Sequence, residues 1–116
     1  MTIPMTGPLR QGSAVAIAPD LIERYRELHA NPWPEVGRLI HESNIRNYSI
    51  FFLPTHNLAF AYSEYIGTDR AADRAKMASH QVIRDWWAEC RPCQVPLSVP
   101  NGDRLWTDLE PIFFQP

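Results

Sequence analysis

The sequence has few cysteines and no long hydrophobic run, and each absence excludes a class of protein. Two cysteines in 116 residues cannot build the disulfide framework of a small secreted protein, which agrees with a reducing compartment. No apolar stretch reaches the roughly 18 residues of a membrane-spanning helix, and residues 1–10 lack a basic leader followed by an apolar segment. We therefore expect a cytoplasmic protein that does not enter a membrane.

A surplus of charge of one sign is also lacking. The formal net charge is −2, and no run of like charges occurs. Because proteins that follow nucleic-acid phosphates need a basic surface, nucleic acid is not an expected partner. The hydrophobic fraction of 45% and the aromatic fraction of 11% are instead typical of a folded globular chain, and the length suits one domain.

The residues at the beginning of the chain indicate a tail that is followed by a strand. Met1–Gly12 is rich in Pro, Gly and Thr and has no periodicity, which indicates an N-terminal tail over residues 1–12. Ser13–Ile17 is a short apolar run that suits a buried strand. We therefore expect one domain that begins with this strand and spans residues 13–116.

A helix is expected directly after this strand. Asp20, with Glu23 three residues later, fits a capping-box start. Side chains that suit a core then recur at helical spacing on one stripe: Leu21, Ile22, Tyr25, Leu28 and His29. Tyr25 and His29 are four residues apart, so both should point inward from one face of the helix.

Prolines and turn residues delimit the next three elements. Pro34 can open a second helix, and Asn44 can supply the left-handed residue that ends it. Ile45–Leu53 and Leu58–Ile66 are rich in Ile, Phe and Tyr, and the turn-forming residues 54–57 separate them. This pattern predicts a β-hairpin.

Both faces of the predicted hairpin carry large side chains. Alternation in its first strand puts Tyr48, Ile50 and Phe52 on one face and Ile45, Phe51 and Leu53 on the other. A sheet with one solvated face would not show this pattern. Because the helices of one chain can cover only one face, the other should meet a partner subunit or a ligand cavity. We expect a homodimer.

The second half of the chain repeats the order of the first. Asp69–Ala78 is rich in alanine, and Gln81–Cys90 carries the adjacent Trp86 and Trp87, which predicts a second pair of helices. Ile112–Phe114 is apolar and bounded by prolines, which predicts a last strand. The whole order is typical of an α+β, ferredoxin-like βαββαβ fold with an antiparallel sheet.

Five motifs occur in a fixed order from about Ser13 to the C-terminus. They are Tyr25-Arg-Glu-Leu-His29, Trp33-Pro34-Glu35, Asn47-Tyr48-Ser-Ile-Phe, Trp86-Trp87 and the ending Leu109-Glu-Pro-Ile-Phe-Phe-Gln-Pro116. In this order and spacing the sequence resembles the L-rhamnose mutarotase family. It departs from the family at Pro32, where an aliphatic residue is usual, and at Asn44, where glycine is usual.

The resemblance implies a dimeric α/β barrel of ferredoxin-like subunits that uses no metal or other cofactor. The implied activity is interconversion of the α and β anomers of L-rhamnose. His29 is implied as the proton donor, and Tyr25, Tyr48, Trp86 and Trp87 as contacts of the sugar. Because Pro32 could reshape the loop beside the site, L-fucose or another deoxy-hexose is the alternative substrate.

Acid/base chemistry by a histidine suits this reaction. Opening a hemiacetal ring puts a proton on the ring oxygen and removes one from the anomeric hydroxyl, and histidine exchanges protons near neutral pH. Spacing alone favours a structural role for His29, and the ordered motifs favour the catalytic one. Glu64 is a candidate second proton-transfer group, because a carboxylate on a covered strand face needs a reason. An ion pair with an arginine explains it equally well.

The two adjacent tryptophans cannot both lie at the centre of one helix face. Neighbouring side chains on a helix diverge by about 100°, so one of Trp86 and Trp87 should be core and the other should face the cavity. A flat ring suits the C–H face and the 6-methyl group of a deoxy sugar. Without the order of the motifs, packing in the core would be sufficient to explain the presence of either tryptophan.

Other chemistries have weaker support. Cys90-Arg-Pro-Cys93 has the spacing of a redox motif but lies at the end of a helix, where the helix dipole does not lower a thiol pKa. The histidines and cysteines lack metal-ligand spacing, and no basic cluster suits a phosphorylated sugar. Two rivals remain, a non-catalytic ligand-binding ferredoxin-like dimer and a cofactor-independent oxygenase, because fold alone does not fix function.

Overall fold

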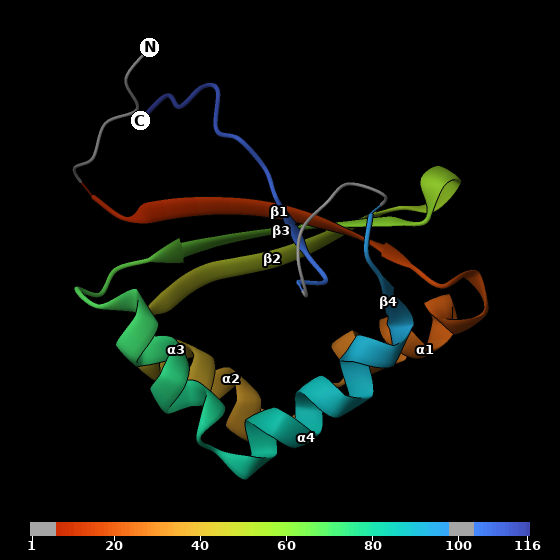
Figure 1. Cartoon of the computed structure of the whole chain (residues 1–116), viewed down its shortest axis with the longest axis horizontal. Coiled ribbons are helices and arrows are strands. Elements are labelled where there is room, and N and C mark those ends of the chain that lie inside the picture. The colour runs from red at the N-terminus through yellow and green to blue at the C-terminus, as the bar shows by residue number, and fades with distance from the viewer. Residues whose placement is uncertain (1–6, 98–103) are drawn as a thin grey trace.

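One curved antiparallel sheet lies above the helices of the chain (Figure 1). The computed structural model describes residues 7–97 and 104–116. The strands run side by side in the order β2 (Ile45–Leu53), β3 (Leu58–Tyr65), β1 (Leu9–Ile17) and β4 (Gln94–Val95), and β5 (Thr107–Asp108) also pairs with β1. Every pairing is antiparallel. This strand order is that of a ferredoxin-like fold, so the predicted α+β class is confirmed.

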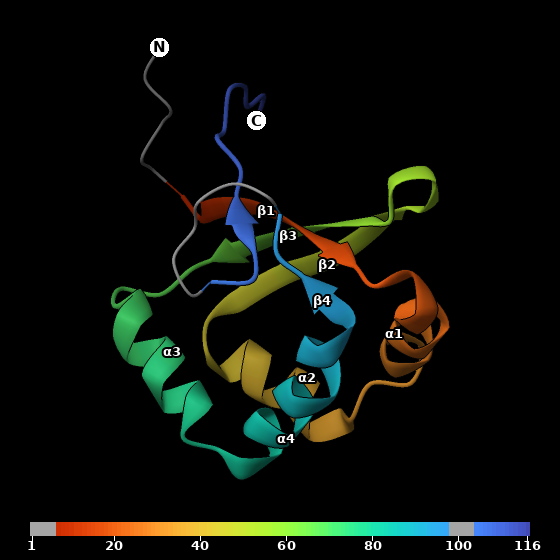
Figure 2. The same ribbon diagram turned by 45° about the vertical axis from the view of Figure 1, so that its right-hand side comes forward.

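Two helix pairs connect the strands and cover the same face of the sheet (Figure 2). The first pair, α1 (Ile22–Ala30) and α2 (Pro34–Glu42), follows β1, and the second pair, α3 (Arg70–Ala78) and α4 (Gln81–Cys90), follows β3. Short 3₁₀ turns lie at Pro19–Leu21, Pro54–His56 and Arg91–Cys93. In the described residues, no helix is long and apolar enough to cross a membrane.

The helix boundaries follow from the residues at their ends. Pro34 is the first residue of α2, where its missing N–H leaves no helical hydrogen bond unmade. Asn44 adopts the predicted left-handed conformation, with φ of 66°. Asp69 caps α3 by accepting a hydrogen bond from the Ala72 backbone N–H. Within the described residues no side chain caps the start of α1, so the predicted capping box at Asp20 is wrong.

A β-bulge in β2 changes the predicted alternation of this strand. Asn47, with φ of 51°, lies at the point where the pairing of β2 with β3 shifts. One extra residue moves the alternation by one position. Simple alternation predicted Ile45 on the same face as Phe51. Because of the bulge, Ile45 instead lies on the sheet face that is covered by the helices. Its cross-strand neighbour Tyr65 points the same way and donates a hydrogen bond to Asp73 of α3.

The two ends of the sheet differ from the prediction. β1 begins at Leu9 instead of Ser13, because residues 9–12 pair with the end of β3. Residues 1–6 of the predicted tail lie outside the described residues. The prediction of a last strand at Ile112–Phe114 is wrong, since these residues lie outside the strands. The fourth strand of the fold is instead the short β4, which follows α4 after the 3₁₀ turn Arg91–Cys93.

The hydrophobic core fills the space between the sheet and the helices. Its buried side chains come from both layers and include Val15, Ile17, Leu28, Val36, Leu39, Ala59 and Ile83. On the other face of the sheet, Ala14 of β1 is only 3% exposed and Leu109 lies against Gly12, whereas Phe51 of β2 is 67% exposed. The expectation that this second face meets a partner subunit stays a prediction.

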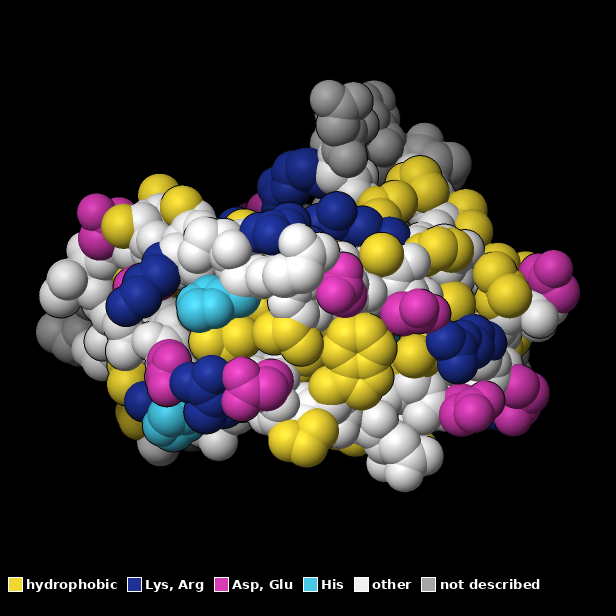
Figure 3. All heavy atoms as spheres, turned by 90° about the horizontal axis from the view of Figure 1, so that it is seen from below, with side chains coloured by type: hydrophobic (Ala, Val, Ile, Leu, Met, Phe, Trp, Pro, Cys, Tyr) yellow, Lys and Arg dark blue, Asp and Glu magenta, His cyan; other side chains and the backbone are white. Residues whose placement is uncertain are grey.

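The helical side of the molecule carries a mixed charged surface. Viewed from below, acidic and basic side chains surround an apolar area (Figure 3). Ion pairs join several charged side chains of the helices, among them Arg38 of α2 with Glu35 and Glu42, each at 2.7 Å.

Candidate functional site

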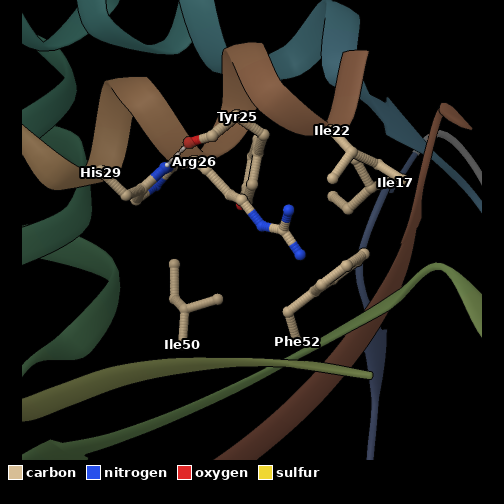
Figure 4. Close-up of a pocket in the computed structure, with 7 residues that line it drawn as sticks. All are labelled: Ile17, Ile22, Tyr25, Arg26, His29, Ile50 and Phe52. Carbon is tan, nitrogen blue, oxygen red and sulfur yellow. Dashed lines mark hydrogen bonds between the residues drawn. The ribbon is translucent and has the colours of Figure 1, made fainter. Parts of the chain in front are cut away.

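A pocket lies between α1 and the strands β1 and β2 (Figure 4). It holds about 430 Å³ of space, part of it open to solvent, and is lined by Ile17, Ile22, Tyr25, Arg26, His29, Ile50 and Phe52. The lining from the strands is apolar. Its polar side chains all come from α1, which presents two successive turns to the pocket. The structure thus brings Tyr25 and His29 together, as their spacing predicted.

One hydrogen bond fixes the orientation of the His29 ring. Its Nδ1 lies 2.8 Å from the backbone oxygen of Tyr25, one turn earlier. Because a carbonyl oxygen only accepts, Nδ1 carries a proton and donates it. Nε2, which has no hydrogen-bond partner among the described residues, is left as the nitrogen that can take up or release a proton.

Two aromatic rings support this imidazole. The His29 ring lies against Tyr25, with centroids 4.4 Å apart, and meets Trp86 in an edge-on arrangement at 5.5 Å. Trp86 is buried and in turn contacts Trp33 at 5.3 Å. His29 is therefore part of a cluster of aromatic rings that joins the pocket residue Tyr25 to Trp86 and Trp33.

Tyr25 and Tyr48, the two tyrosines predicted to contact the sugar, both have hydroxyl groups whose pKa is raised by burial. Tyr25 is buried, and its hydroxyl accepts a hydrogen bond from Gln94 Nε2 at 3.5 Å. Burial raises the pKa of Tyr25 well above its ordinary value, so this hydroxyl stays protonated and cannot serve as a base. Tyr48 of β2 interacts electrostatically with Tyr25. Tyr48 as a whole is 48% exposed. Burial nevertheless raises the pKa of its hydroxyl, which indicates that the hydroxyl end of the side chain is the enclosed part.

The two tryptophans of α4 have different surroundings. Trp86 belongs to the core, whereas Trp87 is only partly buried and lies under the guanidinium of Arg91, 4.8 Å from the ring centroid. Neither lines the pocket. Trp86 reaches the site through His29, and contact of Trp87 with a substrate stays a prediction.

Glu64 lies on the other face of the sheet. It accepts hydrogen bonds from the Tyr62 hydroxyl at 2.9 Å and from Asn47 Nδ2 at 3.2 Å. The next residue, Tyr65, points to the helices, and successive residues of a strand point to opposite faces. Glu64 therefore points away from the pocket, and within one chain it is not brought together with His29.

Arg26 is a pocket residue that the sequence did not predict. Its guanidinium extends from α1 into the pocket toward Phe52, 5.4 Å from that ring's centroid (Figure 4). Glu23 accepts a hydrogen bond from its Nη1 at 2.7 Å. On α1 the residue lies beside the apolar stripe, where an arginine usually faces solvent. The available signal was its position three residues before His29, which makes the two side chains neighbours on the helix.

Neither thiol group is poised for reaction. Cys90 and Cys93 are free and buried. Burial raises the pKa of both thiols, that of Cys90 to about 11. Thiols react as thiolates, so a raised pKa makes them poor nucleophiles. In residues 7–97 and 104–116, no group of three or more His, Cys, Asp and Glu side chains could hold a metal ion.

Fold and site together define the class of protein. It is a ferredoxin-like α+β chain in which the first helix presents one acid/base side chain to a mostly apolar pocket. Residues 10–115 match the family model described as L-rhamnose mutarotase. The chain belongs to the L-rhamnose mutarotase family, as the order of its motifs predicted.

Individual relatives agree with this assignment over nearly the whole chain. An L-rhamnose mutarotase of Mannheimia succiniciproducens is 31% identical over 106 residues, which cover 91% of this chain and 97% of that protein. The crystal structure of an L-rhamnose mutarotase from Formosa agariphila superposes with a TM-score of 0.71 at 21% identity, covering 92% and 98% of the two chains.

The fold itself is shared more widely. Tetracenomycin F2 cyclase of Streptomyces glaucescens, a polyketide cyclase, superposes with a TM-score of 0.62 at 14% identity, covering 93% of this chain and 99% of the cyclase. This similarity concerns the fold alone. It supports the ferredoxin-like class and says nothing about substrate, because one fold hosts many activities.

Proposed function

We propose that this protein is an L-rhamnose mutarotase, which interconverts the α and β anomers of the sugar by opening and closing its ring. Family membership supports the substrate. The observation that carries the chemistry is the hydrogen bond from His29 Nδ1 to the Tyr25 carbonyl, which leaves Nε2 available for proton transfer.

In this proposal, protonated His29 donates its Nε2 proton to the ring oxygen. The bond between C1 and the ring oxygen breaks, and its electron pair stays on that oxygen. The anomeric hydroxyl gives its proton to solvent, and the electron pair of its O–H bond forms the second bond of the C1 carbonyl. After rotation about the C1–C2 bond, the reverse steps on the other face of C1 return the proton to His29 and form the other anomer.

The remaining pocket residues are proposed to bind the sugar. The hydroxyls of Tyr25 and Tyr48 can exchange hydrogen bonds with sugar hydroxyls. Ile50 and Phe52 offer an apolar wall for the C–H face and the 6-methyl group. Trp86 acts by supporting His29, and Trp87 is proposed as a contact that forms with the sugar bound.

We also propose that the protein is a cytoplasmic homodimer. The support for the dimer is the part of the outer sheet face formed by β2, where Phe51 and Leu53 are exposed. An apolar face of this kind favours association, and two such faces packed together would give a dimeric α/β barrel. The cytoplasmic location rests on the low cysteine content.

Exchange NMR on equilibrated sugars tests the activity. Magnetisation transfer between the α and β anomeric signals of L-rhamnose should become faster when catalytic amounts of protein are added. The same experiment on L-fucose tests the alternative deoxy-hexose. Binding of L-rhamnose without faster exchange would favour the non-catalytic dimer, and oxygen uptake with a phenolic substrate would favour the oxygenase.

A further inference from the structure

We propose that Arg26 is a second catalytic residue of this pocket. Its guanidinium would stabilise negative charge on the anomeric oxygen while His29 transfers a proton to the ring oxygen. The inference rests on the proposed mutarotase function. It assigns a pocket residue to the loss of the proton from the anomeric hydroxyl, a step for which the sequence suggested only Glu64.

The other polar groups considered for this step lie outside the pocket or carry no positive charge. Glu64 points to the other face of the sheet, where Tyr62 and Asn47 donate hydrogen bonds to it. The Tyr25 hydroxyl is buried and accepts a hydrogen bond from Gln94. Of the seven residues that line the pocket, only Arg26 carries a fixed positive charge.

Arg26 and His29 reach the pocket from successive turns of α1. Residues three apart on a helix are neighbours on its surface. Figure 4 shows the guanidinium and the imidazole below the same face of α1, opposite Ile50 and Phe52 of β2. A sugar ring resting on Ile50 and Phe52 would therefore have both groups along the side that faces the helix.

The surroundings keep the guanidinium oriented and its charge effective. Glu23 holds Nη1 at 2.7 Å, which leaves further N–H groups of the guanidinium for a ligand. The Glu23 side chain is 86% exposed, against 52% for Arg26, so water screens the carboxylate more strongly than the guanidinium. The apolar lining contributed by the strands strengthens the interaction of the cation with charge that develops in the pocket.

The step itself requires no proton from Arg26. As the anomeric hydroxyl loses its proton to solvent, electron density gathers on its oxygen before it forms the carbonyl with C1. A fixed cation beside this oxygen lowers the energy of that state, in the way that donors of an oxyanion hole do. Arg26 stays protonated throughout, and the same contact assists when the ring closes again.

The test compares Arg26→Gln with the matched control Arg24→Gln. Arg24 is on the same helix, but its guanidinium pairs with Glu89 at 2.7 Å and does not line the pocket. For Arg26→Gln we expect kcat for anomer exchange to fall by about 10²-fold with KM little changed, because the lost interaction forms in the transition state. Arg24→Gln should keep the wild-type values.

Chemical rescue separates catalysis from a structural role. Millimolar guanidinium should restore part of kcat in Arg26→Ala and leave Arg24→Ala unaffected. Wild-type kcat in Arg26→Gln, an effect on KM alone, or absence of rescue in a folded Arg26→Ala would overturn the proposal. If His29→Gln abolishes exchange while Arg26→Gln keeps it, only the role of Arg26 fails. If the wild-type protein does not accelerate exchange, the proposed function fails with it.

Discussion

At the scale of single residues, the geometry of the site depends on hydrogen bonds that orient two polar side chains of one helix. His29 is fixed through Nδ1 by a carbonyl of its own helix, and Arg26 is fixed through Nη1 by Glu23. Both constraints are local to α1 and follow from i, i+3 and i, i+4 spacing. The helix itself therefore orients both side chains.

The tautomer of His29 is a first prediction. The neutral imidazole should carry its proton on Nδ1, because the Tyr25 carbonyl is its acceptor. Nitrogen-15 NMR of the imidazole at alkaline pH distinguishes the two neutral forms. A dominant Nε2–H tautomer would contradict the orientation on which the proposed proton transfer depends.

The thiol of Cys90 supplies a second prediction. With its pKa raised to about 11 by burial, only about 0.1% of this thiol is ionised at about pH 8. Alkylation by iodoacetamide should therefore be slow in the folded protein and fast after addition of urea. Rapid labelling of Cys90 without urea, located by mass spectrometry, would show that the thiol is more accessible and more acidic than its buried position implies.

At the scale of elements, the bulge in β2 decides how the hairpin meets the helices. Asn47 takes up the extra residue in a left-handed conformation. The alternation therefore restarts after it, so that Tyr48 faces the helices while Ile45, before the bulge, does so as well. A strand without the bulge would put one of these side chains on the outer face.

Substitution of Asn47 tests this feature. Asn47→Val should lower the free energy of unfolding by about 1 kcal/mol or more, because a β-branched residue does not tolerate positive φ. Asn47→Gly should be nearly neutral, since glycine adopts this conformation readily. Urea unfolding curves measure both variants, and equal stabilities for the two would argue against a left-handed residue at this position.

The contact between β3 and α3 makes stability depend on pH. A hydrogen bond from the Tyr65 hydroxyl, together with one from Asn44, lowers the pKa of Asp73 below its ordinary value. A carboxyl whose pKa is lower in the folded state stabilises the fold above its unfolded-state pKa, and this stabilisation is lost as the pH falls through the folded-state value.

Tyr65→Phe removes the larger cause of this shift. The pKa of Asp73 should rise toward its ordinary value, so the variant should lose less stability than the wild type when acidified from about pH 6 to pH 2. Unfolding measured along this pH series gives the comparison, with Tyr25→Phe as the control, because the hydroxyl of Tyr25 contacts Gln94 and no carboxylate. Parallel curves for Tyr65→Phe and the wild type would rule out the linkage.

The sequence predicted those elements whose ends or faces are marked by particular side chains. Pro34 and the left-handed Asn44 bound α2, and helical spacing brought Tyr25 and His29 to one face. The bulge was not predictable from alternation, because the pattern of large residues around it is continuous. The strand β4 has only two residues, which is too few for a periodic pattern. The more apolar Ile112–Phe114 therefore gave the stronger indication of a last strand.

At the scale of the whole molecule, the two sides of the sheet are unequal. One side is covered by the helices and contains the pocket, and the other exposes Phe51, Leu53 and, near the C-terminus, Ile112 and Phe113. Several large apolar side chains exposed in this way favour association with a partner. The account therefore predicts a second copy of the chain against the outer face.

Phe51→Asp tests this assembly. Light scattering at micromolar concentration should give twice the mass of one chain for the wild type. The variant should shift toward the monomer, because a carboxylate would have to be buried in the interface. Ala71→Asp, on the exposed side of α3, is the matched control and should remain dimeric. A monomeric wild type would contradict the prediction directly.

The central claim is that His29 transfers the proton that opens the sugar ring. Exchange NMR on L-rhamnose with His29→Gln tests it, with His56→Gln in the exposed hairpin turn as the control. The account predicts that the wild type and His56→Gln accelerate α/β exchange, and that the folded His29→Gln loses at least about 10²-fold of that acceleration. Unchanged exchange with His29→Gln would contradict the account.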